Sequence, residues 1–139
     1  MVYCPKANTM LKSYPSECDI MSIRKAVIPA AGVGSRFLPI SKFVPKELIP
    51  LFNKPIIQYA IEEAIMGGIE EIIIVTSPSK GALDSYVTQT EWSGLHSQAS
   101  ISLVVQDKPL GLGHAVMTAK ELIANEPFAV ILPDDIIRN

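Results

Sequence analysis

The sequence predicts an α/β domain in which helices cover both faces of a mostly parallel sheet. Four short apolar runs have the composition of buried strands. Segments with a helical apolar period lie between most of them, which gives the order βαβαβαβ. The length of 139 residues, with 48% hydrophobic and 19% charged residues, fits one domain with its own core.

The first 22 residues lack the pattern that follows. They show no clear apolar period, and Pro5 and Pro15 interrupt them. We therefore expect residues 1–22 to form a mobile N-terminal extension, with the folded region running over 23–139. The two cysteines, Cys4 and Cys18, fit neither a metal-ligand pattern nor a disulfide framework, and we interpret them as reduced thiols.

The first strand and the first helix are the clearest elements. The run KAVIP predicts a short strand, and PIIQYAIEEAIMGG predicts a helix. Pro55 suits the first helical turn, and Gly67-Gly68 can end the helix. One apolar stripe follows the helical period, and its members are Ile56, Ile57, Ala60, Ile61, Ala64 and Ile65.

The rest of the chain continues the alternation of strands and helices. The run Glu71–Val75 is continuously apolar, as expected of a strand covered on both faces of a sheet, and Phe128–Leu132 is expected to be a fourth buried strand. We expect strands at Glu71–Val75, Ser102–Gln106 and Phe128–Leu132, helices at Ser79–Val87 and Gly113–Ala124, and a polar loop at Thr88–Ser100. In the last helix, Val116, Ala119, Leu122 and Ile123 are expected to face inward.

Charge and hydropathy exclude several classes of partner. The net charge of −2 argues against a nucleic-acid-binding polycation. No apolar run approaches the roughly 20 residues that a membrane span needs, and the start of the chain does not resemble a signal peptide. We therefore expect a cytoplasmic protein without nucleic-acid or membrane partners.

The connection from Ala30 to Pro55, AAGVGSRFLPISKFVPKELIPLFNKP, is unusually long and basic. It leaves the first strand at its carboxyl end, where open α/β sheets bind ligands, and a structureless connection of this length is usually functional. Gly32 and Gly34 allow the backbone to turn tightly, so that its N–H groups can form an anion-binding concavity. Arg36 and Lys46 add positive charge that suits phosphates.

This loop has other interpretations besides a phosphate-binding role. A dinucleotide fingerprint requires a third glycine where Phe37 stands, and Pro39 follows soon after. A Walker-type phosphate loop is also absent. A proline-rich surface loop with solvated charges is the simplest alternative, and for Lys42 and Lys54 solvation is the preferred interpretation.

The full string AAGVGSRFLPISKFVPKELIPLFNKPIIQY resembles the signature of sugar-nucleotide pyrophosphorylases. The form PKELIPL with KPIIQY is most similar to bacterial UTP–glucose-1-phosphate uridylyltransferases. The resemblance runs from about residue 23 to 137, with a shorter segment around Thr88–Ser100. It implies a Rossmann-like, GT-A-type three-layer α/β/α nucleotidyltransferase domain that is truncated, of which residues 23–139 would be the nucleotide-binding N-terminal part.

The resemblance also implies roles for the basic loop. Ala31 and Gly32 would approach the base, while Gly34, Ser35 and Arg36 would lie along the triphosphate. Lys46 would reach the reacting phosphates and neutralise charge as the α-phosphate is attacked. Glu47 would lie beside the nucleotide.

A second cluster is VVQDKPLGLGHA. The amide of Gln106 can donate and accept hydrogen bonds, which suits the edge of a uracil ring. By itself Gln106 would more often be an ordinary polar residue at a strand end, and its match to the base-reading glutamine of the family favours the binding role. Gly111 would bring its backbone to the same base. His114 is expected to be structural, at the start of a helix.

A third cluster, ILPDD, follows the last apolar run. Mg²⁺ prefers hard oxygen ligands, often one or two carboxylates with phosphate oxygens. Asp134 matches the metal-binding aspartate of the family, whereas Asp135 is expected to point elsewhere. The alternative for Asp134 is a turn carboxylate that caps the next element.

The resemblance implies the reaction of UTP with α-D-glucose 1-phosphate to give UDP-glucose and pyrophosphate, assisted by Mg²⁺. Family members are expected to be roughly twice as long and to form homo-oligomers. The alternatives are a nucleotide-binding fragment without catalysis and a glucose-1-phosphate thymidylyltransferase that uses dTTP. ADP-glucose synthesis is less well supported by the same motifs.

Overall fold

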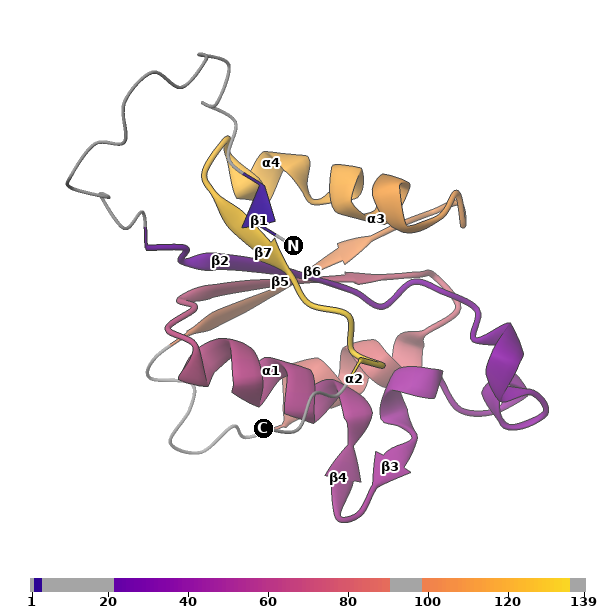
Figure 1. Cartoon of the computed structure of the whole chain (residues 1–139). Coiled ribbons are helices and arrows are strands. Elements are labelled where there is room, and N and C mark those ends of the chain that lie inside the picture. The colour runs from indigo at the N-terminus through magenta and orange to yellow at the C-terminus, as the bar shows by residue number, and fades with distance from the viewer. Residues whose placement is uncertain (1, 4–21, 91–98, 136–139) are drawn as a thin grey trace, which may run out of the picture.

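The computed structural model describes residues 2–3, 22–90 and 99–135. Its main sheet has five strands in the order β1-β7-β2-β5-β6 (Figure 1). Strands β7, β2, β5 and β6 are parallel to one another, and β1 is antiparallel to β7. The bounds are Val2–Tyr3 (β1), Lys25–Pro29 (β2), Glu71–Thr76 (β5), Ser100–Val105 (β6) and Phe128–Val130 (β7). The predicted mostly parallel sheet is therefore confirmed.

Helices cover both faces of this sheet. Helices α1 (Ile56–Met66) and α2 (Gly81–Gln89) lie on one face, and α3 (Leu112–Thr118) and α4 (Lys120–Ile123) lie on the other (Figure 1). Strand β2 serves both layers because successive side chains point to opposite faces. Ile28 packs in the core under α1 and α2, whereas Val27 packs against α3 and α4. The three-layer α/β/α fold is confirmed.

The strand order places a switch point beside β2. From β2 the chain proceeds to β5 and then β6 on one side, and it returns to pair β7 with the other side of β2. Lys25 lies opposite Glu71 in β5 and opposite Phe128 in β7. Open α/β sheets bind ligands beyond the carboxyl ends of the strands at such a point. A ligand site is therefore expected at the loops that follow β2 and β7.

Helix α1 follows its predicted stripe closely. All stripe members except the half-buried Ile56 are buried. Pro55 is the N-cap residue in extended conformation, one position before the first helical residue. Gly68 has a φ of 85°, the left-handed conformation that glycine adopts readily after a helix end.

The helix predicted at Gly113–Ala124 differs from the structure. It is divided into α3 and α4 at Ala119, and it begins one residue earlier, at Leu112. Ala119 and Ile123 are buried as predicted and Val116 is half-buried, but Leu122 is 42% exposed. The inward prediction for Leu122 was wrong because the single turn of α4 presents Ile123 to the sheet instead.

Other boundaries also moved. Strand β5 extends to Thr76, β6 ends at Val105, and β7 ends at Val130, two residues before the predicted end. Helix α2 begins and ends two residues later than predicted, so Thr88 and Gln89 are helical, and β6 begins at Ser100. The remainder of the predicted polar loop, 91–98, lies outside the described residues. Strand β7 is half-buried along its length, so the prediction of a fully buried fourth strand was wrong. The reason is that α3 and α4 cover it incompletely.

The basic connection is an ordered segment, which corrects the expectation of a structureless loop. It contains three short 3-10 turns, η1 (Ser35–Phe37), η2 (Ile40–Lys42) and η3 (Lys46–Leu48). A small hairpin, β3 (Pro50–Leu51) with β4 (Lys54–Pro55), then leads into α1.

The N-terminal segment contributes a short strand. Val2 and Tyr3 pair with Ala129 and Phe128 of β7, which the sequence did not predict. Residues 4–21, to which most of the mobility prediction applies, lie outside the described part of the chain. Within the described ranges, none of the helices has the length and apolarity that a bilayer crossing requires.

Candidate functional site

A cleft opens at the carboxyl ends of β2, β6 and β7. It has a volume of about 320 Å³ and adjoins a hollow of about 400 Å³ along the loop after β2. The two spaces share Gly32, Val33, Lys46, Leu112 and Asp134. Together they are lined by these predicted site residues: Ala31, Gly32, Gly34, Ser35, Arg36, Lys46, Gln106, Gly111 and Asp134. Glu47 is the one predicted residue that lines neither space.

The glycine-rich turn packs closely against the lysine that follows it. Gly34 has a φ of 66°, which side-chain-bearing residues rarely adopt. A Cβ atom on Gly34 would lie 3.3 Å from the Cβ atoms of both Lys46 and Ser41. Glycine at this position therefore permits both the turn and the close approach of η3, and the backbone of Gly32 to Ser35 borders the cleft.

Lys46 and Asp134 meet across the cleft. The Lys46 Nζ atom donates a hydrogen bond of 2.8 Å to Asp134 Oδ2, and the two side chains are 17% and 37% exposed. This bond to Lys46 holds the pKa of the Asp134 carboxyl below its ordinary value, with a smaller contribution from the charge of Arg36. The carboxylate is therefore ionised at neutral pH, beside a lysine and an arginine.

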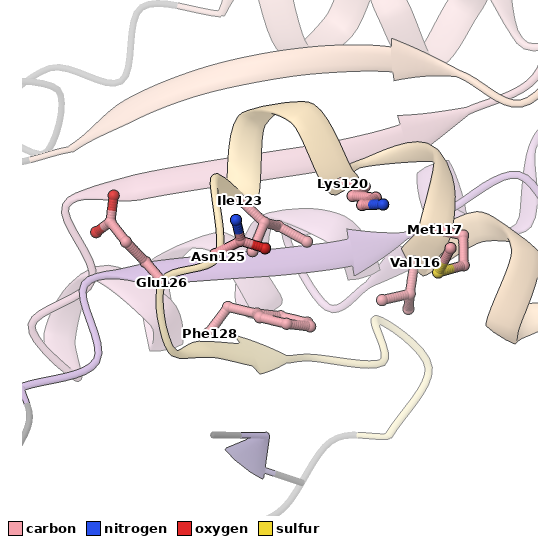
Figure 2. A pocket seen from close by; sticks show the side chains of 7 residues that line it. All are labelled: Val116, Met117, Lys120, Ile123, Asn125, Glu126 and Phe128. Carbon is pink, nitrogen blue, oxygen red and sulfur yellow. The ribbon is translucent and has the colours of Figure 1, made fainter. Parts of the chain in front are cut away.

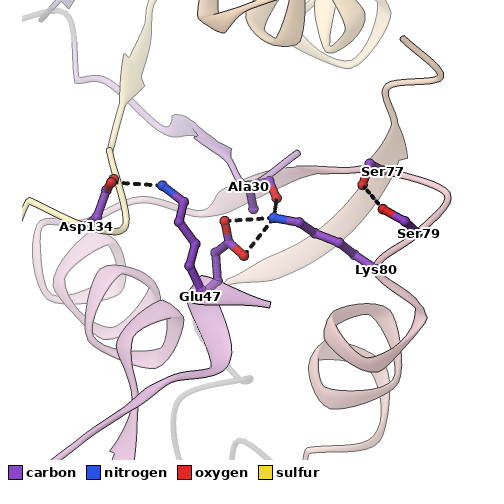
Figure 3. A network of polar contacts seen from close by, with 7 residues as sticks. Ala30, Glu47, Ser77, Ser79, Lys80 and Asp134 are labelled. Carbon is purple, nitrogen blue, oxygen red and sulfur yellow. Dashed lines mark hydrogen bonds and ion pairs between the residues drawn. The ribbon is translucent and has the colours of Figure 1, made fainter. Parts of the chain in front are cut away.

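Glu47 has a different environment from its neighbour Lys46. Its side chain is 1% exposed and accepts hydrogen bonds of 2.9 and 2.8 Å from Lys80 Nζ. The same ammonium donates a hydrogen bond of 2.6 Å to the carbonyl oxygen of Ala30. Figure 3 shows the Glu47 carboxylate and the Ala30 carbonyl converging on Lys80. Burial lowers the pKa of Lys80, and the bonds to Glu47 oppose that shift.

Sequence reasoning missed Lys80. A turn after β5 presents it, in which the Lys80 N–H donates to the Ser77 carbonyl oxygen at 2.9 Å and the Ser77 and Ser79 hydroxyls lie 3.1 Å apart (Figure 3). The available signal was its position just beyond the carboxyl end of a buried strand, where site residues of open α/β sheets gather.

Gln106 is buried at the end of β6 and is held within the protein. Its Nε2 atom donates to the Gly111 carbonyl oxygen at 3.3 Å and lies 2.7 Å from His114 Nδ1. His114 is therefore a partner of Gln106 at the start of α3. Gly111 has φ 92° and ψ 179°, a conformation that is nearly exclusive to glycine.

The remaining charged candidates lie apart from the cleft. Lys42 is exposed, as predicted. Lys54 is ion-paired with Glu62 and lies over the Tyr59 ring, 4.5 Å from its centroid. The prediction that Lys54 is solvated was wrong, because the hairpin brings it against α1. Asp135 lines a different hollow with Glu63, in agreement with the expectation that it points elsewhere.

The arrangement fits a cation held jointly with a ligand. The described residues contain no group of three or more histidine, cysteine or carboxylate side chains that could hold a metal. Among the described residues that line the cleft, Asp134 alone supplies an ionised, accessible carboxylate. A single carboxylate is a typical protein contribution to Mg²⁺ sites in which substrate phosphates supply further oxygens. Asp134 therefore fits such a site only when a phosphate ligand is bound.

A second hollow lies on the other side of α3. It has a volume of about 450 Å³, and Figure 2 shows it between α4 and β7. Its lining combines the apolar side chains of Val116, Met117, Ile123 and Phe128 with the polar side chains of Lys120, Asn125 and Glu126. It lacks the glycine-rich backbone and the lysine–aspartate pair of the first cleft, so we assign the candidate site to the first.

Comparisons with known proteins identify the family to which the chain belongs. The protein family described as "Nucleotidyl transferase" matches residues 25–139. UTP–glucose-1-phosphate uridylyltransferase 1 of Staphylococcus saprophyticus is 45% identical over 85% of this chain, and the corresponding Bacillus subtilis protein is 47% identical over 84%.

Solved structures of UDP-glucose pyrophosphorylases are also similar to the chain. UDP-glucose pyrophosphorylase of Acinetobacter baumannii, also solved in a UTP-bound form, superimposes with a TM-score of 0.73 and 39% identity over 84% of this chain. A UDP-glucose pyrophosphorylase complexed with UDP-glucose has a TM-score of 0.70 and 46% identity over 81% of the chain. The chain spans about half the length of these relatives, covering 46–47% of each.

Proposed function

The chain belongs to the nucleotidyl transferase family, and we propose that it forms the nucleotide-binding part of an enzyme that makes UDP-glucose. In the proposed reaction, UTP and α-D-glucose 1-phosphate give UDP-glucose and pyrophosphate. The observation that carries the proposal is the 2.8 Å contact between Lys46 and Asp134 in a cleft bordered by glycine-rich backbone. The names of the relatives supply the base and the sugar.

The nucleotide is proposed to lie along the loop after β2. Its uracil would enter the part of the cleft between Ala31, Gln106 and Gly111, which line the same space. Because the Gln106 amide nitrogen is already bonded to Gly111 and His114, its oxygen is the atom that would accept the uracil N3–H. The triphosphate would follow the adjoining hollow past Ser35 and Arg36.

The charges in the cleft are suited to a magnesium-bound triphosphate. Mg²⁺ bound by Asp134 and phosphate oxygens would supply charge neutralisation at the reacting phosphate. For Asp134 to bind it, Lys46 must exchange its carboxylate partner for a phosphate oxygen. The flexible stem of a lysine side chain allows the ammonium to move from one partner to the other without a change in the backbone. The Lys46 ammonium would thus move from Asp134, its partner in the ligand-free protein, to the triphosphate.

The chemical step is a displacement at the α-phosphorus of UTP. An oxygen of the glucose 1-phosphate group forms the new bond to that phosphorus, and the bond to the leaving pyrophosphate breaks. Lys46 and Arg36 would stabilise the charge that develops on the transferring phosphate and the leaving group. No covalent bond to the protein is required, so positioning and electrostatics are the whole contribution of these residues.

The proposed function has two alternatives. A putative glucose-1-phosphate thymidylyltransferase of Bacillus anthracis is also similar in structure, with a TM-score of 0.67, but its identity of 30% is lower than that of the uridylyltransferase relatives. The other alternative is a chain that binds nucleotide without turnover. The cytoplasmic location and the homo-oligomeric state expected for the family stay predictions.

Calorimetric titration tests the proposal. The purified chain is titrated with UTP, dTTP and ATP, each with Mg²⁺. We expect a saturable UTP signal that is tighter than those of dTTP and ATP. Equal affinity for all three, or no UTP binding by the folded chain, would contradict the proposal. Release of pyrophosphate on adding glucose 1-phosphate would then separate an enzyme from a binding fragment.

A further inference from the structure

Two buried lysines lie at opposite ends of strand β2. Lys25 begins the strand and is bonded to Glu126, Glu71 and the Leu122 carbonyl oxygen at 2.9, 3.3 and 3.0 Å. Lys80 binds the carbonyl of Ala30, the residue after the strand, and the carboxylate of Glu47. Each residue is 6% exposed. The first lies at the end of the strand away from the cleft, and the second contacts Ala30, which precedes the cleft-lining Ala31.

Lys80 connects three separate segments. It precedes α2, its carboxylate partner belongs to η3, and its carbonyl partner follows β2. Both oxygens of Glu47 are bonded to the one ammonium. Glu47 is adjacent to Lys46, whose side chain extends in the other direction, to Asp134 in the cleft. The 3-10 turn that carries both residues is therefore anchored on one side and reaches the cleft on the other.

We propose that Lys80 is a positioning residue for the nucleotide-binding loop, because its contacts with Glu47 and Ala30 fix the turn from which Lys46 reaches into the cleft. The inference rests on the proposed function for the identity of the ligand, and on the contacts alone for the positioning. It also reassigns Glu47, which acts through Lys80 rather than as a side-chain contact to the nucleotide.

Removing the ammonium has a predictable consequence. Lys80→Met keeps most of the side-chain volume but leaves the Glu47 carboxylate buried without its partner. An uncompensated buried charge is strongly unfavourable, so Glu47 moves towards water. Because Glu47 lies in η3, the turn opens, and the amides of Leu48 and Ile49 lose their bonds to the carbonyls of Pro45 and Lys46.

Hydrogen exchange at those two amides, measured by NMR on the full chain, tests the positioning without any ligand. In Lys80→Met we expect exchange of the Leu48 and Ile49 amides to accelerate at least tenfold, after correction for global stability with core amides of β5. Lys25→Met is the matched control, and it should accelerate these loop amides no more than it accelerates the core. Equal exchange in Lys80→Met and wild type, or equal acceleration in both variants, would overturn the inference.

A second variant guards against failure of Lys80→Met to fold. Glu47→Gln keeps the shape of the side chain but removes the charge of the carboxylate, to which Lys80 donates two hydrogen bonds. We therefore expect a smaller acceleration of exchange at the same amides, about threefold. Unchanged loop amides in Glu47→Gln would overturn the inference even where Lys80→Met cannot be studied.

UTP titration of the same variants separates this inference from the proposed function. We expect Lys80→Met to bind UTP with Mg²⁺ at least tenfold more weakly than wild type and Lys25→Met to bind within twofold of wild type. UTP affinity in Lys80→Met equal to wild type would overturn the positioning role. Wild-type protein that binds no UTP but shows the predicted exchange would contradict the proposed function and support the positioning.

Discussion

Lys46 and Asp134 are 88 positions apart in the chain and 2.8 Å apart in space. The sequence motif predicted a phosphate-facing role for the first and a metal-binding role for the second. It could not predict that they would bond to each other, because that contact depends on the parallel pairing of β2 with β7. Nor could it predict that Glu47, which the resemblance places beside the nucleotide, is buried against Lys80, a residue that no motif indicated.

Loss of either basic residue should weaken triphosphate binding. In Arg36→Ala and Lys46→Ala we expect UTP affinity to fall about 10- to 100-fold each, the range for removing a hydrogen bond to a charged group. Calorimetry measures the change. Lys42→Ala, which removes an exposed lysine from the same loop, is the control and should bind as wild type. Unchanged affinity in both site variants would remove the loop from the site.

Asp134 should link UTP binding to magnesium. In wild type, we expect UTP affinity to fall when Mg²⁺ is removed with EDTA. In Asp134→Asn that dependence should be largely lost, since the carboxylate that binds the cation is absent. Titrations with and without Mg²⁺ give the two dependences. An undiminished magnesium effect in the variant would place the cation elsewhere.

The same carboxylate should contribute to acid stability. Because its folded-state pKa lies below the ordinary value, its bond to Lys46 stabilises the fold above that ordinary value, and the contribution is lost as pH falls through the folded-state pKa. We expect the stability difference between wild type and Asp134→Asn to shrink in the acidic range, as the pH falls below the ordinary carboxyl pKa of 3.8. Urea unfolding across this range measures it, and a difference independent of pH would argue against the ion pair.

At the scale of elements, the sequence predicted the positions of the four parallel strands and of α1 to within about two residues, because their apolar patterns are continuous or periodic. It failed where packing decides the outcome. The break at Ala119 and the exposure of Leu122 follow from how a short turn sits on the sheet, and no local signal marks them. The hairpin of β3 and β4 was missed because each strand has only two residues.

The turn before α3 gives a test at this scale. Gly111 has a φ of 92°, so Gly111→Ala should destabilise the protein by about 1–3 kcal/mol through backbone strain. Gly113 lies in α3, and a Cβ there meets nothing within 4 Å. Gly113→Ala should therefore be neutral or stabilising, by up to about 1 kcal/mol. Urea unfolding of both variants provides the comparison, and equal effects would contradict the conformational argument.

At the scale of the whole molecule, the alternation of elements predicted the three-layer architecture, because only a parallel sheet buried on both faces accommodates such apolar strands. The strand order could not be predicted from the alternation of elements. The pairing of β7 with β2, rather than with β6, creates the switch point that brings Asp134 to the glycine-rich loop. The sequence therefore predicted the elements that border the cleft but not the strand order that brings them together.

The stability that Lys25 contributes at the amino-terminal end of β2 should decrease at alkaline pH. Lys25 joins β2, β5 and the segment before β7, and its bond to Glu126 raises its pKa above the ordinary 10.5. A raised pKa stabilises the fold below the ordinary value, and this contribution disappears as pH rises through the folded-state pKa. We expect the stability advantage of wild type over Lys25→Met to diminish above pH 10.5. Thermal unfolding from neutral to alkaline pH measures it, and a constant difference would refute the linkage.

The proposal that the cleft at the switch point binds UTP can be tested by NMR titration of the full chain with UTP and Mg²⁺. We expect amide shift changes at Gly32, Gly34 and Gly111 and in the segment around Asp134, with the hollow between α4 and β7 unperturbed. Shift changes confined to that second hollow, around Val116 and Phe128, or none in the folded chain, would contradict it.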